Sequence, residues 1–349
     1  METKIEELRV STFKIPTDGP ESDGTLEWDS TTLVLVQIVA GGIEGLGFTY
    51  ASQSTAVLIQ EKLQAVVLGR DAMDTAGTWA SMGCAVRNLG RPGISSMAIA
   101  AVDIALWDLK GRLLNQPLAK LLGQVRPGIA AYGSGGFTSY SIPRLQSQLS
   151  DWAKMGLRSV KMKIGRDSQN DAARIHGARE AIGPATELFV DANGAYSPKQ
   201  ALKTATEFDT DAVGWFEEPV VSDDLEGLRF VREHVSNATR IAAGEYGYDL
   251  VYFRRMLEAG AVDVLQADAT RCGGITGFMQ VATLCDAFVM PLSAHTAPSI
   301  HQHVCCAAPR ACNVEYFYDH YRIEHEFFDG AAKPVNGDLI PDLSRPGLG

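Results

Sequence analysis

Hydrophobic and polar residues follow two different patterns along the chain, and the pattern changes near residue 125. Before that point, residues 8–15, 31–40 and 43–50 read as strands, and the Gly41-Gly42 pair between the last two predicts a hairpin. Two helical patterns follow before Gly93. Residues 95–114 then predict a long helix that begins at Ser95 and has one apolar face. Residues 1–125 are therefore expected to form a small α+β domain.

The segment between the first two predicted strands, residues 16–30, is rich in Gly, Pro and acidic residues. We expect it to be too polar to pack. A structureless loop of this length is usually either disordered or a functional lid. The sequence therefore predicts a lid that is disordered without substrate and orders over a site when substrate binds.

From about residue 129 short apolar runs alternate with helical patterns. There are eight such runs: 129–136, 158–165, 187–193, 213–219, 240–246, 262–268, 288–295 and 313–317. Strands that alternate with helices in this way are typical of a parallel (β/α) barrel. Periodicity alone leaves an open, doubly wound sheet as the alternative.

Ionisable residues lie at the ends of nearly all these runs, and this favours the barrel. They are Lys161, Lys163, Asp191, Glu217, Glu245, Asp268, His295 and Glu315. In a barrel the carboxyl ends of the strands meet at one mouth, whereas in an open sheet they lie along a line. Because a buried charge is costly unless it is paired or bound to a metal, we expect these side chains to form one site.

Lys161 and Lys163 are two residues apart in a predicted strand, so their side chains point to the same side. We expect that side to be the barrel interior, because two lysines facing the helix layer would be very unfavourable. Two ammonium groups held close together depress each other's pKa. The pair therefore predicts a lysine that acts as a general base near pH 7.

Asp191, Glu217 and Glu245 end three consecutive predicted strands, at spacings of 26 and 28 residues. Any one of them alone would more readily be interpreted as a helix cap. Three crowded carboxylates repel one another unless a cation binds among them. Mg²⁺ suits a site with few carboxylates and open positions for substrate oxygens, so the three predict an Mg²⁺ site.

Asp268 and His295 end the next two strands and predict a catalytic dyad, because an Asp bonded to one ring nitrogen raises the basicity of the other. Glu315 ends the last strand. There a carboxylic acid could donate a hydrogen bond to a substrate oxygen, or the side chain could form a structural ion pair. His301 and His303 lie inside a predicted helix, and we interpret them as structural.

Composition narrows the class of protein. The 349 residues are 46% hydrophobic and 21% charged, with a net charge of −11 and no basic stripe, so nucleic acid and anionic membranes are poor partner candidates. No apolar run approaches the roughly 20 residues that span a bilayer, and the first residues lack signal-peptide features. Six cysteines without a CxxC pair predict reduced thiols in a cytoplasmic protein.

The ordered set K-M-K, D-A-N, W-F-E-E-P, G-E, Q-A-D and S-A-H-T resembles the enolase superfamily, in its mandelate racemase-like subgroup. The resemblance covers nearly the whole chain. It implies a modified (β/α)₇β barrel over residues 126–318. It also implies an α+β capping domain over residues 1–125, completed by residues 319–349, and a homo-oligomer that is a dimer or an octamer.

The same resemblance implies roles for the residues of the site. One Mg²⁺ per subunit would bind Asp191, Glu217 and Glu245. Lys163 would be one general base, assisted by Lys161, with His295 and its partner Asp268 on the opposite face of the substrate and Glu315 as an electrophilic partner. Asn193, Lys161, Ser134 and Trp28 are the expected substrate contacts.

Two positions separate this chain from related subgroups. The muconate-lactonizing subgroup carries a lysine where Asp268 stands, and the glucarate dehydratase-like subgroup usually has Asn where Glu245 stands. The polar segment around Trp28 suits a polyhydroxylated acid better than an aryl acid. The sequence thus favours an acid-sugar dehydratase that forms a 2-keto-3-deoxy acid. The alternatives are a racemase or epimerase of a 2-hydroxy acid, and a sugar-acid binding or structural protein on the same fold that has no catalytic activity.

Overall fold

The computed structural model describes residues 3–349, and its N-terminal part is an antiparallel sheet in the order β1 (Ile5–Ser22), β2 (Glu27–Ala40) and β3 (Ile43–Tyr50). The predicted hairpin is confirmed, with Ala40 opposite Ile43 in the register. Gly41 and Gly42 in its turn have φ values of 57° and 74°. A two-residue turn of this kind requires positive φ at both positions, which glycine adopts without strain.

Helical segments follow this sheet along the chain, and some of them pack against it. They are α1 (Gln53–Leu58), η1 (Ile59–Leu63), α2 (Gln64–Val67), α3 (Thr75–Ala85), η2 (Arg87–Leu89), α4 (Ile94–Leu113) and α5 (Leu118–Leu121). The long predicted helix is α4. Its Ala98, Ala101 and Ala105 lie in one buried cluster with Val34, Val36 and Ile38 of β2. The expected small domain thus has a hydrophobic core of its own.

The approach of β3 to α4 depends on Gly47, and replacing this residue with alanine is expected to destabilise the fold. A Cβ at Gly47 would lie 2.3 Å from the Ala101 carbonyl oxygen and from the Ala105 nitrogen, so the helix must move. Overpacking of this kind costs about 1–3 kcal/mol. Urea unfolding should show a lower midpoint for Gly47→Ala. The control is Gly214→Ala, whose added Cβ would meet only an arginine nitrogen at 3.9 Å. Equal midpoints for the two variants would contradict this account.

The second part of the chain forms a parallel eight-stranded barrel. Its strands are β4 (Ile129–Gly135), β5 (Ser159–Lys163), β6 (Glu187–Asp191), β7 (Val213–Glu217), β8 (Arg240–Ala243), β9 (Val264–Ala267), β10 (Leu292–Ala294) and β11 (Ala311–Phe317). β11 pairs with β4 in parallel, which closes the barrel. The predicted barrel is confirmed, and the open sheet is excluded.

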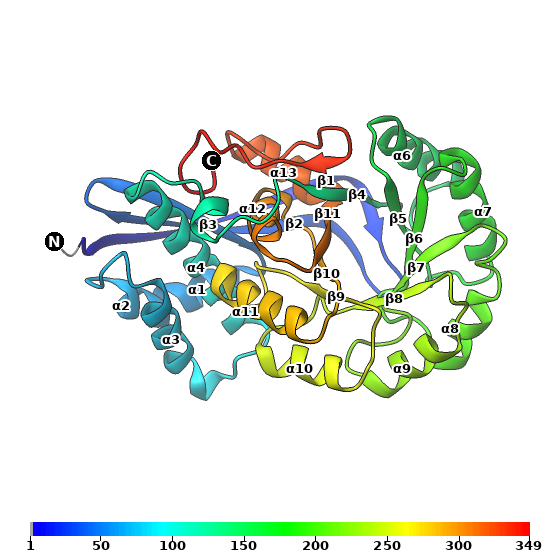
Figure 1. The fold of residues 1–349 in the computed structure, drawn as a ribbon, viewed down its shortest axis with the longest axis horizontal. Coiled ribbons are helices and arrows are strands. Elements are labelled where there is room, and N and C mark those ends of the chain that lie inside the picture. The colour runs from blue at the N-terminus through cyan, green and yellow to red at the C-terminus, as the bar shows by residue number, and fades with distance from the viewer. Residues whose placement is uncertain (1–2) are drawn as a thin grey trace.

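Seven helices connect the eight strands, in the (β/α)₇β arrangement that the sequence predicts. They are α6 (Ile142–Lys154), α7 (Asp171–Ile182), α8 (Pro198–Ala205), α9 (Leu225–His234), α10 (Leu250–Glu258), α11 (Gly274–Ala287) and α12 (Pro298–Ala307). In Figure 1 they surround the barrel, while the N-terminal domain lies to the left in blue and cyan.

Apolar and aromatic side chains fill the amino-terminal half of the barrel interior. Tyr132, Phe189 and Trp215 lie there with Ala242 and Val264, all buried. Side chains two residues further along a strand point the same way. Asp191 and Glu217 follow Phe189 and Trp215 at this spacing, so they lie above the aromatic layer, toward the mouth.

The prediction for residues 16–30 is wrong in one respect, because this segment is regular structure. β1 and β2 extend through it as a hairpin, with Pro16 opposite Ser30 and Glu21 opposite Trp28. The barrel loop after β4 donates hydrogen bonds to its backbone, from Thr138 N to Ser22 O at 2.8 Å and from Ser139 Oγ to Pro20 O at 2.8 Å. β1 is an edge strand, where proline is tolerated. The hairpin lies over the barrel mouth, as expected of a lid.

After the barrel, the chain continues through α13 (Tyr318–Phe327) and β12 (Asp338–Leu339) and returns to the N-terminal domain. Leu118 N donates to Gly347 O at 2.7 Å, and Leu348 N donates to Asp108 Oδ1 at 2.7 Å. Figure 1 shows this red segment beside the blue and cyan domain. The last residues thus pack on α4 and α5.

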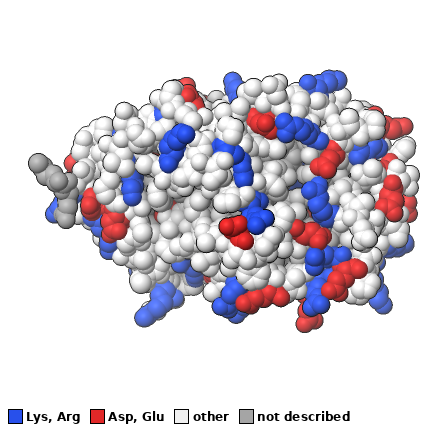
Figure 2. Space-filling view, in the orientation of Figure 1, with Lys and Arg blue, Asp and Glu red and all other residues white. Residues whose placement is uncertain are grey.

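Basic and acidic side chains are interspersed on the face drawn in Figure 2, and no broad patch of one sign appears among the residues described there. Within residues 3–349, no helix combines the length and the apolar character needed to cross a membrane.

Candidate active site

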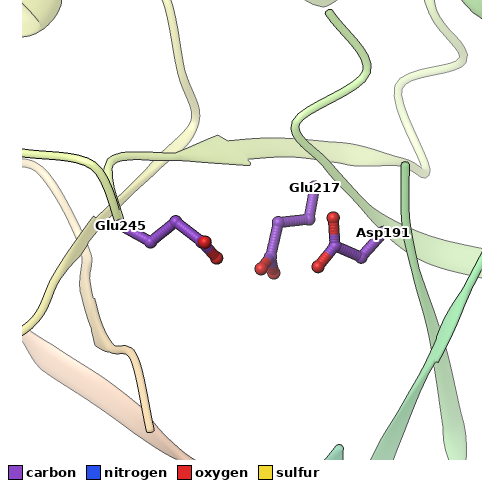
Figure 3. Close-up of side chains that lie close together, drawn as sticks. All are labelled: Asp191, Glu217 and Glu245. Atoms are coloured by element: carbon purple, nitrogen blue, oxygen red, sulfur yellow. The ribbon is translucent and has the colours of Figure 1, made fainter. Parts of the chain in front are cut away.

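Three buried carboxylates form the centre of the site. Asp191 and Glu217 are the last residues of β6 and β7, and Glu245 lies just beyond β8. Each offers an oxygen, and these oxygens all lie within 4.8 Å of one another. Figure 3 shows the carboxylates turned toward one another from successive strands. The structure therefore brings together the three side chains that the sequence singles out.

The chemistry of this set fits a hard divalent ion. Burial, followed by the negative charges of Asp191 and Glu315, raises the pKa of Glu217 to about 8, against the opposing effect of Lys161. Glu245 Oε2 accepts no hydrogen bond of good geometry from the described residues, although it is buried. His295 is its ion-pair partner among the described residues, and an oxygen-preferring cation between the three carboxylates would complete its coordination. The residues present therefore fit Mg²⁺.

Lys161 and Lys163 both point into the barrel, as predicted from their spacing. Lys161 Nζ lies 2.9 Å from Glu315 Oε1 and also contacts Glu217, and Lys163 Nζ contacts Asp191. The predicted pKa depression is wrong for this arrangement. Burial and the charge of Lys161 act to lower the pKa of Lys163, but the Asp191 carboxylate outweighs them and raises it. The neighbouring carboxylates dominate because they lie in direct contact.

Asp268 and His295 form the predicted pair, with 2.9 Å between Asp268 Oδ2 and His295 Nδ1. The other ring nitrogen, Nε2, lies 3.2 Å from Glu245 Oε2. Burial acts to lower the pKa of His295, but Glu245 and the other carboxylates raise it to about 9. The histidine is therefore held in place through one nitrogen and presents the other at the carboxylate centre.

Two histidines predicted to be structural have main-chain partners. His301 Nε2 accepts from Ala269 N at 2.9 Å, and its Nδ1 lies 2.7 Å from Thr296 O. His303 Nε2 lies 3.0 Å from Leu348 O. His301 thus links the loop that follows Asp268 to the loop that follows His295.

Glu315 accepts hydrogen bonds here and does not donate them. Ser134 Oγ and Lys161 Nζ donate to its Oε1, and Thr296 N donates to its Oε2 at 3.2 Å. Burial acts to raise its pKa, but Lys161 and His295 lower it to about 2. Glu315 therefore takes the ion-pair arrangement in this structure, and its role as a protonated donor to substrate stays a prediction.

A cavity of about 370 Å³ opens above the carboxylates. Seven of the predicted site residues line it: Trp28, Lys163, Asn193, Glu245, Asp268, His295 and Glu315. Lys163 enters from β5 and His295 from the end of β10, the second and seventh strands of the barrel. The cavity therefore has a titratable group on either side and the carboxylate centre beside both.

Two of the predicted substrate contacts lie deeper than the cavity. Ser134 and Lys161 are fully buried and lie outside the cavity lining, because each is bound to Glu315 at the base of the site. Trp28 does line the cavity, but its Nε1 lies 3.1 Å from Glu21 Oε2 and 3.4 Å from Asp319 Oδ2. Its indole N–H is therefore engaged within the protein, and its role as a substrate contact stays a prediction.

Sequence reasoning missed several residues of the cavity wall. Arg271 lies 3.4 Å from Glu245 Oε1 and 3.6 Å from Asp268 Oδ2, and Asp319 and His320 come from the start of α13. Arg271 stands three residues after Asp268 in the loop beyond β9, and Asp319 follows the last strand by two residues. Their position just beyond a strand end is the signal that could have found them.

Family models match nearly all of this architecture. The model for the N-terminal domain of mandelate racemase and muconate lactonizing enzymes matches residues 14–123, and the enolase C-terminal domain-like model matches residues 144–349. A capped barrel with acidic, lysine and histidine side chains at its mouth defines the enolase superfamily as the class. The chain belongs to its mandelate racemase/muconate lactonizing enzyme family.

Individual relatives support this assignment. A mandelate racemase/muconate lactonizing enzyme-like protein from Rubrobacter xylanophilus is 51% identical, with a TM-score of 0.97 over 99% of this chain and 96% of that one. A Streptomyces coelicolor racemase, solved with bound magnesium, is 31% identical, with a TM-score of 0.93 over 99% and 96%. Arabinonate dehydratase from Saccharolobus solfataricus is 31% identical over 90% of this chain and 88% of its own length. Other relatives are named as cycloisomerases and as a dipeptide epimerase.

Proposed function

We propose that this protein is an Mg²⁺-dependent acid-sugar dehydratase. It would remove the proton next to the carboxylate of a sugar acid and expel the hydroxyl from the neighbouring carbon, giving a 2-keto-3-deoxy acid. Asp191, Glu217 and Glu245 would hold the ion.

One observation carries the proposal. Lys163 and the His295–Asp268 pair line the same cavity from the second and seventh barrel strands, beside the three-carboxylate centre. Two proton-transfer groups on either side of one substrate carbon suit chemistry that removes a proton and then delivers one. The hydroxyl side chains of Ser30, Thr31 and Thr32 in the cavity wall suit a polyhydroxylated substrate.

In the proposed reaction Lys163 takes the α-proton, which leaves an enediolate on the substrate. His295, protonated and oriented by Asp268, gives a proton to the β-hydroxyl as the C–O bond breaks and water leaves. The resulting enol takes a proton at the third carbon and becomes the 2-keto acid. As at enolase-superfamily sites generally, Mg²⁺ would supply positive charge that stabilises the enediolate and offsets the carboxylate charge beside Lys163 and His295.

One of the relatives is described as a racemase, so we also consider a second reaction. If the substrate carries no β-hydroxyl, His295 would return a proton to the opposite face of the enediolate, which inverts the α-carbon. The polar cavity wall favours dehydration over this outcome.

A library of mono- and diacid sugars tests the proposal. With Mg²⁺ present, at least one of them is expected to give a 2-keto acid, detected as its semicarbazone. Inversion of a 2-hydroxy acid with no keto product from any library member would replace the dehydratase with the epimerase.

A further inference from the structure

We infer that the substrate is a monocarboxylic sugar acid of the aldonate type, whose far end is an alcohol, and that Asp23 accepts a hydrogen bond from one of its hydroxyls. This inference rests on the proposed function and narrows its substrate class. It depends on the charge of the cavity wall opposite the barrel, which we call the cap wall. The cap wall consists of residues 23–32 and 50–52 together with Asp319 and His320.

The substrate carboxylate belongs at the carboxylate centre and the α-carbon between Lys163 and His295, so the remaining carbons must extend toward the cap wall. Among the described residues that line the cavity, the positively charged candidates are Lys163, Arg271 and His295, and all three lie at the barrel side. Arg271 is already shared between Glu245 and Asp268. Burial lowers the pKa of His320, the one basic side chain of the cap wall.

The cap wall is acidic. Asp23 and Asp319 line it, and the buried carboxyl of Glu21 lies behind it, joined to Asp319 through the indole nitrogen of Trp28. Burial, then the hydrogen bond and charge of Asp319, raises the pKa of Glu21 to about 9. The carboxyl groups of the cap wall are thus so crowded that Glu21 stays protonated near neutral pH. A second carboxylate on the substrate would meet the negative charge of the remaining carboxylates.

Two arginines lie close by, but both are engaged outside the cavity lining. Arg322 lies 3.3 Å from Asp319 Oδ1, and Arg166 lies 2.7 Å from Glu27 Oε2. Neither lines the cavity, so neither is placed to bind a distal carboxylate.

Asp23 offers the acceptor that a hydroxyl needs. Its Oδ1 accepts from Thr25 N and Leu26 N at 2.6 Å each, which fixes the side chain at the tip of the β1–β2 hairpin. Its Oδ2 accepts no hydrogen bond from the described residues. Asp319 differs, because Trp28, Thr31 and Arg322 satisfy both of its oxygens. One open oxygen beside neutral hydroxyl side chains suits an alcohol better than a distal ammonium group, which would need several free acceptors.

Matched pairs of acids test the inference. Each pair, such as gluconate with glucarate and galactonate with galactarate, differs only in the terminal group, which is CH₂OH in one member and carboxylate in the other. Because like charges placed side by side strongly disfavour binding, kcat/KM for the aldarate is expected to be at least about 100-fold below that of its matched aldonate. Asp23→Asn should raise KM for the aldonate. It should also reduce the ratio of kcat/KM for the aldonate to kcat/KM for the aldarate. Asp151→Asn, which removes an exposed charge on α6, should leave the ratio unchanged.

The outcomes separate this inference from the proposed function. An aldarate turned over as fast as its aldonate, or an ω-amino acid preferred to both, overturns the inference and leaves the dehydratase in place. If no pair gives a keto acid, the proposed dehydratase function is wrong. The exchange of α-protons with D₂O then tests the inference about the substrate. Exchange from aldonates alone supports it, and exchange from neither class overturns it.

Discussion

Replacing Lys163 with alanine is expected to lower kcat for sugar-acid dehydration by about 10²–10⁴-fold, the usual contribution of a general base. The same variant should lose the exchange of the α-hydrogen with solvent deuterium, because Lys163 lines the cavity on the side from which the proposed mechanism removes that proton. Both quantities can be followed by proton NMR in one D₂O experiment.

His295→Asn should lose net conversion to a similar extent but keep the exchange. Lys163 can still remove the α-proton in this variant, and its ammonium group can return a deuteron, while the proton for the leaving hydroxyl is missing. Lys154→Ala and His234→Asn are the matched controls, since both side chains lie on outer helices. Undiminished turnover by Lys163→Ala would contradict the mechanism as a whole. One-sided exchange of opposite enantiomers by the two variants, with no keto acid formed, would instead indicate a racemase.

The second large effect is expected on metal binding. Glu217→Gln removes one of three carboxylates from the centre of the site, and affinity for Mg²⁺ should fall by more than about 100-fold, since changes to residues that only support a ligand already cost 10–100-fold. Turnover should fall with it. Calorimetric titration of Mg²⁺ into the wild type and the variant measures the affinity directly.

The fold should survive this substitution, because Lys161 keeps Glu315 at 2.9 Å as a partner. Thermal unfolding followed by circular dichroism checks this point. Glu233→Gln, in which an exposed glutamate of α9 loses the same charge, is the control. Unaltered Mg²⁺ affinity in Glu217→Gln would show that the ion, if bound at all, lies elsewhere.

Most of the barrel could be predicted from the sequence because one local rule repeats in it. Nearly every strand is a short apolar run with an ionisable residue at its carboxyl edge, so the positions of Asp191, Glu217, Asp268 and His295 along the chain suffice to assign them to one mouth. Closure of the sheet then brings them together, as the 2.9 Å contact between Asp268 and His295 shows.

The predictions that were wrong depend on neighbours from distant parts of the chain. Residues 16–30 appeared too polar to pack because the barrel loop that satisfies them lies more than 100 residues away, at Thr138. The lysine pKa depression was inferred from Lys161 and Lys163 alone, whereas the carboxylates of β6, β7 and β11 decide it. The burial of Ser134, a predicted substrate contact, likewise follows from a distant residue, because its hydroxyl donates to Glu315.

The residues of the cap wall were the hardest to predict. Asp319 lies in a helix beyond the last strand, and the indole nitrogen of Trp28 and the hydroxyl of Thr31 hold it, across nearly the whole length of the chain. Contacts of this kind follow from how the two domains pack, and no local pattern indicates them.

In the proposed reaction, this site removes an α-proton and then eliminates a β-hydroxyl. The most direct measurement is a proton NMR time course of the wild-type protein with Mg²⁺ and an aldonate in D₂O. The proposed mechanism predicts loss of the α-hydrogen signal together with the appearance of a 2-keto-3-deoxy acid that carries one deuterium at the third carbon. A deuterated epimer that accumulates without any keto acid would contradict it.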